Sequence, residues 1–168
     1  MSNKQNDKPL QISVEQSKLL GNALRIKIIG VLAEEPHTAK QVADILGNSP
    51  GSVHYHIQKL YEGGLIELVE TKELGGIIEK YYKSKSKWFN TDSPTGVDNV
   101  LDEGFSSTYS QQLSLRIQLT EQQREEMSED FKVFLEKWVK KTMIENKNID
   151  AVEYAIGVKI VSTEEKSK

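Results

Sequence analysis

The sequence predicts an α+β fold in two parts. Two short helical patterns separated by a turn occupy residues 38–62, and two strand-like segments joined by a glycine turn follow over residues 65–82. Further along the chain, two segments of alternating apolar and polar residues flank a long helical pattern. We therefore expect an N-terminal unit of helices closed by a β-hairpin, and a C-terminal unit with the order strand, helix, strand.

The first elements precede the central motif and supply it with a packing surface. Residues 1–12 are polar and have no periodicity, which predicts a mobile arm. Ser13 and Gln16 have the spacing of a capping box, and the helix that they begin is broken near Gly21. A second helix is expected from Asn22, with an apolar stripe that the following helices can cover. The stripe consists of Leu24, Ile28, Val31 and Leu32.

The central motif is a pair of short helices. Gly47 and Asn48 tolerate the left-handed conformation that ends the first helix, while Ser49 is a good N-cap and Pro50 suits the first position of the second. The apolar stripe of the first helix consists of Ala39, Val42, Ala43 and Leu46. That of the second consists of Val53, Ile57 and Leu60. Helix, tight turn and helix form a helix-turn-helix motif, whose second helix can enter the major groove of DNA.

A β-hairpin is expected directly after this motif. Residues 65–70 and 77–82 have the composition of paired strands, and Leu74, Gly75 and Gly76 provide a turn between them. A hairpin in this position is a wing, so the N-terminal unit is predicted to be a winged helix-turn-helix.

Over roughly residues 19–82 the sequence resembles the winged-helix repressors of the ArsR type. The motifs that carry the resemblance are Ala23-Leu24-Arg25, Val53-His54-Tyr55-His56-Ile57 with Leu60, Gly63-Gly64-Leu65-Ile66, and Gly75-Gly76-Ile77-Ile78-Glu79-Lys80-Tyr81-Tyr82. The resemblance implies a DNA-binding transcriptional regulator, expected to be a homodimeric repressor that reads a palindromic operator.

The second helix of the motif and the wing are expected to contact double-stranded DNA. Placing the apolar stripe of the helix toward the core turns its opposite side outward, at 100° per residue. The predicted DNA-binding residues are Ser49, Ser52, Tyr55, His56, Gln58, Lys59, Lys72, Gly75 and Gly76. His56 matches a histidine that is common in the ArsR pattern. The resemblance also suggests a phosphate contact for Arg25, with a surface ion pair as the alternative.

The sequence offers no transition-metal or cofactor site. Many ArsR-type repressors sense metals through cysteines or clustered histidines, whereas this chain has no cysteine, which excludes a thiol-based sensor. His54 and His56 are two residues apart, so on a helix their side chains point about 200° apart and could not chelate one ion. We therefore expect no metal and no cofactor.

Charge and composition limit the other classes of protein. Residues 1–93 carry 12 Lys and Arg against 11 Asp and Glu, and residues 94–168 carry 10 against 14, so the acidity lies in the C-terminal half. No apolar run approaches the roughly 20 residues of a membrane helix, and the N-terminus lacks an apolar signal core, which predicts a cytoplasmic protein without a membrane segment. No glycine-rich phosphate loop, GxSxG or HExxH motif is present, so we do not expect an enzyme.

The C-terminal half has a regular pattern after an irregular start. Residues 83–99 predict a linker and residues 97–105 a short helix. Strands are expected over residues 113–119 and 152–160, with a long helix from a capping box at residue 120 to about residue 146 between them. Two strands under one helix expose their edges, which implies a partner sheet from a second copy of the chain.

We therefore expect two domains, a winged-helix DNA-binding domain over residues 13–90 and a C-terminal dimerisation domain over residues 97–163. Aromatic side chains of the second domain could line a cavity for a small apolar effector, although such a stripe is more often plain core. These candidate ligand-binding residues are Phe131, Phe134, Trp138 and Tyr154.

Two other functions remain open on the sequence. The near-neutral first half also fits a winged helix used for protein–protein contact without DNA binding. RNA binding through the lysines that follow the wing has less support, because the wing carries Glu70 and Glu73 besides Lys72. Salt-dependent binding to any duplex would separate the first of these from a DNA-binding regulator.

Overall fold

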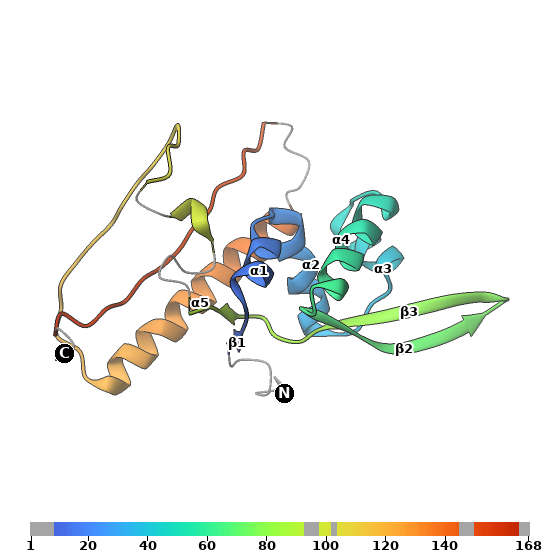
Figure 1. The fold of residues 1–168 in the computed structure, drawn as a ribbon, viewed down its shortest axis with the longest axis horizontal. Helices are drawn as coiled ribbons and strands as arrows, with labels where there is room; N and C mark the ends of the chain where they lie inside the picture. The colour runs from blue at the N-terminus through green and yellow to red at the C-terminus, as the bar shows by residue number, and fades with distance from the viewer. Residues whose placement is uncertain (1–8, 93–97, 102–103, 145–149, 165–168) are drawn as a thin grey trace.

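The computed structural model describes residues 9–92, 98–101, 104–144 and 150–164 (Figure 1). The N-terminal half contains β1 (Leu10–Gln11), α1 (Val14–Ser17), the 3-10 helix η2 (Lys18–Leu20), α2 (Ala23–Glu34), α3 (Ala39–Leu46), α4 (Pro50–Glu62), β2 (Ile66–Leu74), β3 (Ile77–Ser84) and β4 (Phe89–Asn90). The C-terminal half contains the 3-10 helix η3 (Asn99–Leu101) and α5 (Glu121–Ile144). The predicted α+β fold with an N-terminal winged helix-turn-helix is confirmed.

Polar side chains cap the helices of the N-terminal half. Ser13 and Thr38 each form a reciprocal capping box, and the side-chain oxygens of Asn22 and Ser49 each accept a backbone N–H of the first turn. α3 ends at Gly47, whose φ of 63° is left-handed, as the sequence predicted. Each cap of this kind contributes about 1 kcal/mol, so the helix starts are determined locally before any tertiary contact forms.

The core lies where α2, α3 and α4 meet the base of the hairpin. Val53, Ile57 and Leu60 on α4 are at most 1% exposed, which confirms the predicted inward stripe. The other members of this core are Ile12, Leu20, Ile28, Ile29, Val31, Leu32, Val42, Ala43, Leu46, Leu65, Ile66 and Tyr82. Of the stripe expected on α2, Leu24 is only half-buried, although it packs against the same core.

The wing is an antiparallel hairpin of β2 and β3 that extends away from the helices (Figure 1). Leu74 pairs with Ile77 at its tip, and the two residues between them have φ angles of 61° and 80°, which favour Gly75 and Gly76. At the base, Tyr82 exchanges backbone hydrogen bonds with His37 of the α2–α3 loop. The hairpin is therefore longer than predicted at its first strand, and its base is fixed to the helices.

The arm and the linker expected from the sequence are wrong over the residues that the structure describes. Leu10 and Gln11 pair in parallel with Phe89 and Asn90, and Ile12 is buried; residues 1–8 lie outside the described chain. Within the expected linker, the small polar side chains of Ser84 and Ser86 are buried and bond to backbone carbonyls two residues on. Two short segments far apart in sequence stabilise each other here, and neither is long enough to show periodicity.

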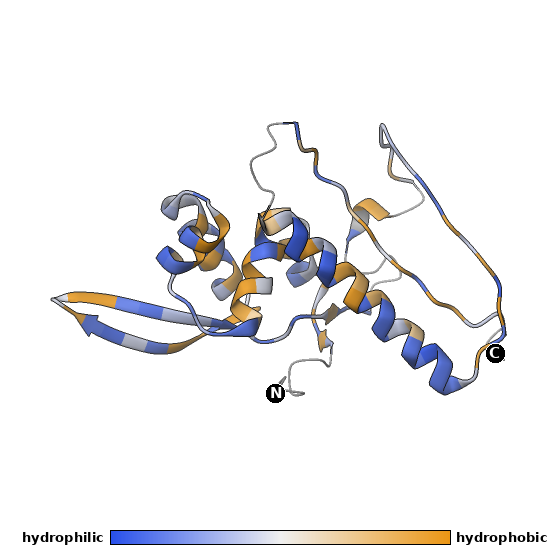
Figure 2. Cartoon of the chain, turned by 180° about the vertical axis from the view of Figure 1, so that it is seen from behind, coloured by the Kyte–Doolittle hydropathy of each residue, from blue (hydrophilic) through white to orange (hydrophobic). Residues whose placement is uncertain are grey.

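The long helix α5 is confirmed and packs on α2. It begins with the predicted capping box at Thr120. Its last turns lie against the middle of α2, where a Cβ added to Gly30 would stand 2.9 Å from the Met143 Cε. The Lys27 ammonium donates to the Thr142 carbonyl at 3.0 Å. Figure 2 shows hydrophilic and hydrophobic stretches alternating along this helix. Of the short helix expected over residues 97–105, the structure has the single 3-10 turn η3.

The two strands expected on either side of α5 are not assigned in the single chain. Residues 104–120 and 151–162 have neither helix nor ladder, although Figure 1 shows residues 151–162 running beside α5. A strand needs a neighbour for its backbone N–H and C=O groups, and neither segment pairs with any residue that the structure describes. Their apolar side chains are correspondingly exposed, Leu113 by 87% and Val152 by 70%. Within the described ranges, no helix is long and apolar enough to cross a membrane.

Candidate nucleic-acid interface

The outer side of α4 carries polar and aromatic side chains, as the sequence predicted. Its buried stripe fixes the rotation of the helix, so Tyr55 is 53% exposed and His54 is exposed beside it. Ser52 and Gln58 are half-buried on the same helix. Ser49 lies at its N-cap, where the hydroxyl accepts the Ser52 N–H at 3.4 Å. The structure therefore exposes Tyr55 on the outer side of α4, with Ser52 and Gln58 half-buried on the same helix.

Glu62 binds two of the predicted DNA contacts in the free protein. Its carboxylate lies 3.6 Å from the Lys59 ammonium and accepts a hydrogen bond from the Gln58 amide at 3.2 Å. The Lys59 ammonium also lies 5.9 Å from the centre of the Tyr55 ring. These contacts are at the surface and each is weak, about 0.5 kcal/mol. DNA phosphates would have to compete with Glu62 for both side chains.

His56 is held by Arg25 of α2 rather than by a neighbour on its own helix. The Arg25 Nε donates to the His56 Nδ1 at 3.2 Å, and the Arg25 Nη1 donates to the Leu19 carbonyl at 3.1 Å. A ring nitrogen that accepts carries no proton, so the proton of the neutral ring is on Nε2. Burial and then the Arg25 charge lower the pKa of His56 below its usual value, which keeps the ring neutral at pH 7. His56 is therefore a neutral donor through Nε2.

Arg25 makes a contact that the sequence did not predict. The resemblance suggested a phosphate contact, with a surface ion pair as the alternative, and the phosphate contact stays a prediction. In this structure the guanidinium connects Leu19 to the middle of α4 through two hydrogen bonds. Sequence reasoning missed this contact because residues 25 and 56 belong to different helices, and no local spacing relates them. The pairing of Glu62 with Gln58 and Lys59, by contrast, follows the helical spacings i, i+4 and i, i+3 and could have been found.

The wing combines a lysine that already has an acidic partner with exposed apolar side chains at its tip. The Lys72 ammonium lies 3.0 Å from the Glu70 carboxylate and 4.6 Å from the centre of the Tyr81 ring, and the hydrogen bond to Glu70 raises its pKa. Gly75 and Gly76 have open space around them at the tip. Leu74, Ile77 and Ile78 next to them are 56%, 69% and 64% exposed.

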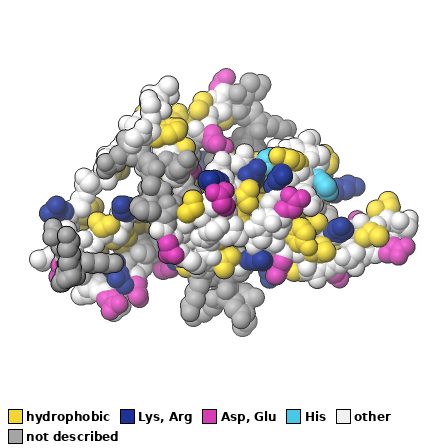
Figure 3. Space-filling view, viewed as in Figure 1, with side chains coloured by type: hydrophobic (Ala, Val, Ile, Leu, Met, Phe, Trp, Pro, Cys, Tyr) yellow, Lys and Arg dark blue, Asp and Glu magenta, His cyan; other side chains and the backbone are white. Residues whose placement is uncertain are grey.

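On the face shown in Figure 3, positive charge is not gathered into one patch. Figure 3 shows Lys and Arg side chains interspersed with Asp and Glu on the face in view. Of the lysines that follow the wing, Lys87 lies 2.7 Å from Glu34 of α2. Glu34 also lies 3.9 Å from Lys140 of α5. A DNA-binding surface on this protein would therefore rely on a few well-placed contacts rather than on a general basic field.

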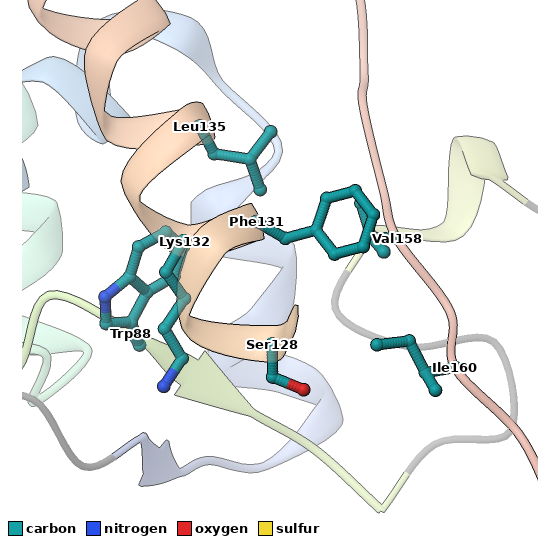
Figure 4. Close-up of a pocket in the computed structure, with 7 residues that line it drawn as sticks. All are labelled: Trp88, Ser128, Phe131, Lys132, Leu135, Val158 and Ile160. Carbon is teal, nitrogen blue, oxygen red and sulfur yellow. The ribbon is translucent and has the colours of Figure 1, made fainter. Parts of the chain in front are cut away.

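The candidate ligand residues are only partly brought together. Phe134 and Trp138 meet edge to face, with ring centres 6.5 Å apart, whereas Tyr154 lies against Tyr109. A cleft of about 200 Å³ lies beside α5 (Figure 4). It is lined by Trp88, Ser128, Phe131, Lys132, Leu135, Val158 and Ile160. Of the predicted residues only Phe131 lines this cleft. Among the described residues, no group of three or more His, Asp or Glu is placed to hold a metal ion.

Comparison with known proteins bears on the N-terminal half. A family model described as a helix-turn-helix domain matches residues 20–69, which include α2, α3, α4 and the start of β2. No curated protein matches the chain. Among solved structures, the chain is similar to the homodimeric winged helix-turn-helix DNA-binding domain of Mb0332 from Mycobacterium bovis, a possible ArsR-family transcriptional regulator. That match has 25% identity and a TM-score of 0.36, and it covers 44% of this chain and 65% of the other, just under two thirds.

The fold and the family match together identify the N-terminal half as a winged helix-turn-helix domain. This is the type of domain that DNA-binding transcriptional regulators use.

Proposed function

We propose that this protein is a homodimeric transcriptional repressor of the ArsR type that binds a palindromic DNA site. The observation that supports the proposal best is the arrangement of α4. Its inner stripe is almost fully buried, while Tyr55 lies on the opposite, solvent-exposed side of the same helix and His56 is held on its flank by Arg25. A helix fixed in this way, second in a helix-turn-helix, fits the major groove.

The residues of α4 then divide between phosphate and base contacts. Ser49 and Ser52 lie at the N-terminus of the helix, where hydroxyl and backbone N–H groups suit a phosphate. Tyr55 offers its ring and hydroxyl, Gln58 can bond to a base edge, and Lys59 neutralises a phosphate once it leaves Glu62. Because α4 has no arginine for bidentate guanine recognition, each half-site carries modest specificity. In a homodimer, two copies of α4 would read the two half-sites of a palindrome together, which raises the specificity for the whole site.

The wing adds contacts that position the domain. At Gly75 and Gly76 no side chain separates the backbone from the DNA, so the tip can approach the minor groove or a phosphate closely. The Lys72 ammonium can leave the Glu70 carboxylate and bind a DNA phosphate in its place. Deleting residues 74–76 is therefore expected to lower affinity for all sequences alike rather than to change the preferred bases.

The C-terminal half, residues 97–163, is proposed to dimerise and to bind a small apolar effector. Its long helix contacts the DNA-binding half, residues 13–90, through the Gly30 and Lys27 contacts on α2. The cleft beside α5 supports an effector site, with Phe131 in its wall. Phe134, Trp138 and Tyr154 would join such a site only after rearrangement. The same proposal places the protein in the cytoplasm, where its DNA is.

Selection of bound sequences from random duplexes tests the proposal directly, since it reports both binding and the symmetry of the site. A palindromic consensus with two half-sites about 10 base pairs apart is expected. In the double variant Tyr55→Ala/Lys59→Ala, specific affinity should fall at least about tenfold. The matched control is Lys137→Ala on the exposed side of α5, which should bind as the wild type does. Unchanged affinity in a folded double variant would contradict the role of α4.

The alternative function, a winged helix for protein–protein contact without DNA binding, is favoured by one observation. The wing tip exposes Leu74, Ile77 and Ile78, and the adjacent Lys72 already has an acidic partner. Affinity for an arbitrary duplex at several salt concentrations separates the two functions. DNA binding through phosphates predicts that affinity falls steeply as salt rises, whereas a protein-contact module predicts no measurable binding at any salt concentration.

A further inference from the structure

Residues 151–162 form a strand-like segment without a strand beside it. The structure gives this segment no ladder with any described residue. Its five alternating apolar residues are each between 42% and 70% exposed. They are Val152, Tyr154, Ile156, Val158 and Ile160. Unpaired backbone next to an exposed apolar row is a template for another strand.

We propose that residues 152–160 pair antiparallel with the same residues of a second copy of the chain, in a register centred on Ile156. This inference rests on the homodimer of the proposed function and specifies its interface. In this register Ile156 lies opposite itself on the two-fold axis. Glu153 lies opposite Lys159 of the second copy, and the symmetry forms this pair twice.

The charges and the apolar row select this register together. Val152 lies opposite Ile160 and Tyr154 opposite Val158, so all five apolar residues face apolar residues. A register centred on Ala155 or on Gly157 separates Glu153 from Lys159 of the second copy. The first of these registers places Ile160 opposite Asp150, and the second places Val152 opposite Ser162. Opposite charges and apolar side chains directly across an antiparallel pair both stabilise it.

The other unpaired segment lacks this self-complementarity. In residues 113–119, the self-pairing that matches all four apolar residues places Arg116 opposite Arg116. Like charges directly opposite destabilise a strand pair. The sequence therefore favours residues 152–160 as the strand at the two-fold axis.

The surroundings of the segment are compatible with such a pair. Val158 and Ile160 lie beside Phe131 of α5 (Figure 4), and Tyr154 lies edge to face against Tyr109, so the apolar face already has neighbours along part of its length. On the other face, Glu153 accepts the Ala23 N–H through Oε2 at 2.8 Å, and its second carboxylate oxygen remains for a lysine. A Cβ on Gly157 would lie 2.5 Å from Leu101, so that face has room only for a small residue.

Single-cysteine crosslinking tests the centre of the register, because the chain has no cysteine of its own. Two copies of Ile156→Cys would bring their Cα atoms about 4.5–5.5 Å apart, within the range of a disulfide. We expect a covalent dimer on oxidation of the two thiols with diamide at low protein concentration. The matched control is Tyr154→Cys, whose own counterpart would be about 13 Å away. It should not crosslink alone but should crosslink in a mixture with Val158→Cys.

Charge reversal tests the flanking pairs. Glu153→Lys places two lysine pairs across the dimer and Lys159→Glu two glutamate pairs, and each should weaken self-association about tenfold in sedimentation equilibrium. The double variant Glu153→Lys/Lys159→Glu should restore it. A mixture of the two single variants should also form heterodimers in preference to either homodimer, since that combination rebuilds both pairs.

The outcomes distinguish this register from dimerisation itself. If Tyr154→Cys crosslinks as readily as Ile156→Cys, or if the charge reversals leave sedimentation unchanged, the register is wrong while the homodimer stands. A wild-type chain that remains monomeric at all concentrations overturns the homodimer, and the register with it.

Discussion

The two halves of this protein show equally regular sequence patterns but very different burial. On α4, Val53 and Leu60 are fully buried by α2 and α3 of the same chain. In the C-terminal half, Leu113 and Ile156 belong to alternations as regular, yet they are 87% and 68% exposed. The N-terminal half therefore buries the stripes of its helices within one chain, whereas two segments of the C-terminal half have no strand partner among the described residues.

The difference shows that a pattern identifies which face of a segment must be buried, but not which chain will bury it. A helix satisfies its own backbone, so α5 forms wherever its sequence favours it. A strand cannot satisfy its own backbone, so a segment with a strand pattern forms a strand only when a neighbouring strand supplies the hydrogen bonds. In the hairpin each strand is the neighbour of the other, while residues 113–119 and 152–160 have no such neighbour in the part of the chain that the structure describes.

The largest expected effect comes from breaking the core of the self-sufficient half. Leu60→Ala should lower the free energy of unfolding by about 2–5 kcal/mol, because a fully buried leucine leaves a cavity. Ile156→Ala should change it by less than about 0.5 kcal/mol in the monomer, where the side chain is 68% exposed. Urea denaturation at protein concentrations below dimerisation measures both.

Repeating these titrations at higher protein concentration sharpens the comparison. The effect of Leu60→Ala should stay constant, and that of Ile156→Ala should grow as the dimer forms, since Ile156 lies at the two-fold axis of the proposed dimer. Equal and concentration-independent effects of the two substitutions would show that the halves do not differ in this way.

A second test concerns the contact that joins the halves. Gly30→Val should destabilise the protein by up to about 1 kcal/mol, because the end of the flexible Met143 side chain on α5 would have to move aside. Gly51→Val is the matched control, since Gly51 is also helical but has open space around it. Thermal unfolding compares their stabilities, and limited proteolysis of α5 reports whether the helix has left α2. Similar behaviour of the two variants would argue against this contact.

The sequence was sufficient for the fold of the N-terminal half because its signals are local. Caps at Ser13 and Ser49, the left-handed Gly47 and the turn at Gly75 act within a few residues and were readable without any tertiary information. The pairing of Leu10 with Phe89 was not readable, because two-residue strands carry no period and lie 79 positions apart.

The candidate site was predictable as a surface, though not as a set of contacts. Helical geometry placed Tyr55 on the outer side of α4, and the structure agrees. The Arg25–His56 hydrogen bond depends on how α2 crosses α4, which no spacing in the sequence encodes. Whether the predicted residues contact DNA remains a prediction.

The surroundings of His56 are expected to make the stability of the N-terminal half depend on pH. Burial and then the Arg25 charge lower the pKa of His56 in the folded protein, so below the usual histidine pKa of about 6.5 the unfolded chain binds more protons. The free energy of unfolding should therefore fall as pH decreases from about 7 through the folded-state pKa of His56. Chemical denaturation between pH 5 and 8 measures the slope. His56→Gln should remove part of it, and a slope unchanged in that variant would assign the effect to other groups.

The smallest expected effect lies at the edge of the DNA-binding surface, where Glu62 binds Gln58 and Lys59. Glu62→Gln removes the charge that competes with phosphates, so affinity for duplex DNA should rise about two- to fivefold at low salt, and the gain should shrink as salt rises. Stability should change by less than about 0.5 kcal/mol, because the contacts are exposed.

The control, Glu136→Gln on α5, makes the same change of net charge away from α4. An equal gain in both variants would indicate a general effect of charge. A loss of affinity in Glu62→Gln would mean that Glu62 orients Lys59 for binding rather than withholding it, and titration of labelled duplex by fluorescence anisotropy distinguishes the two.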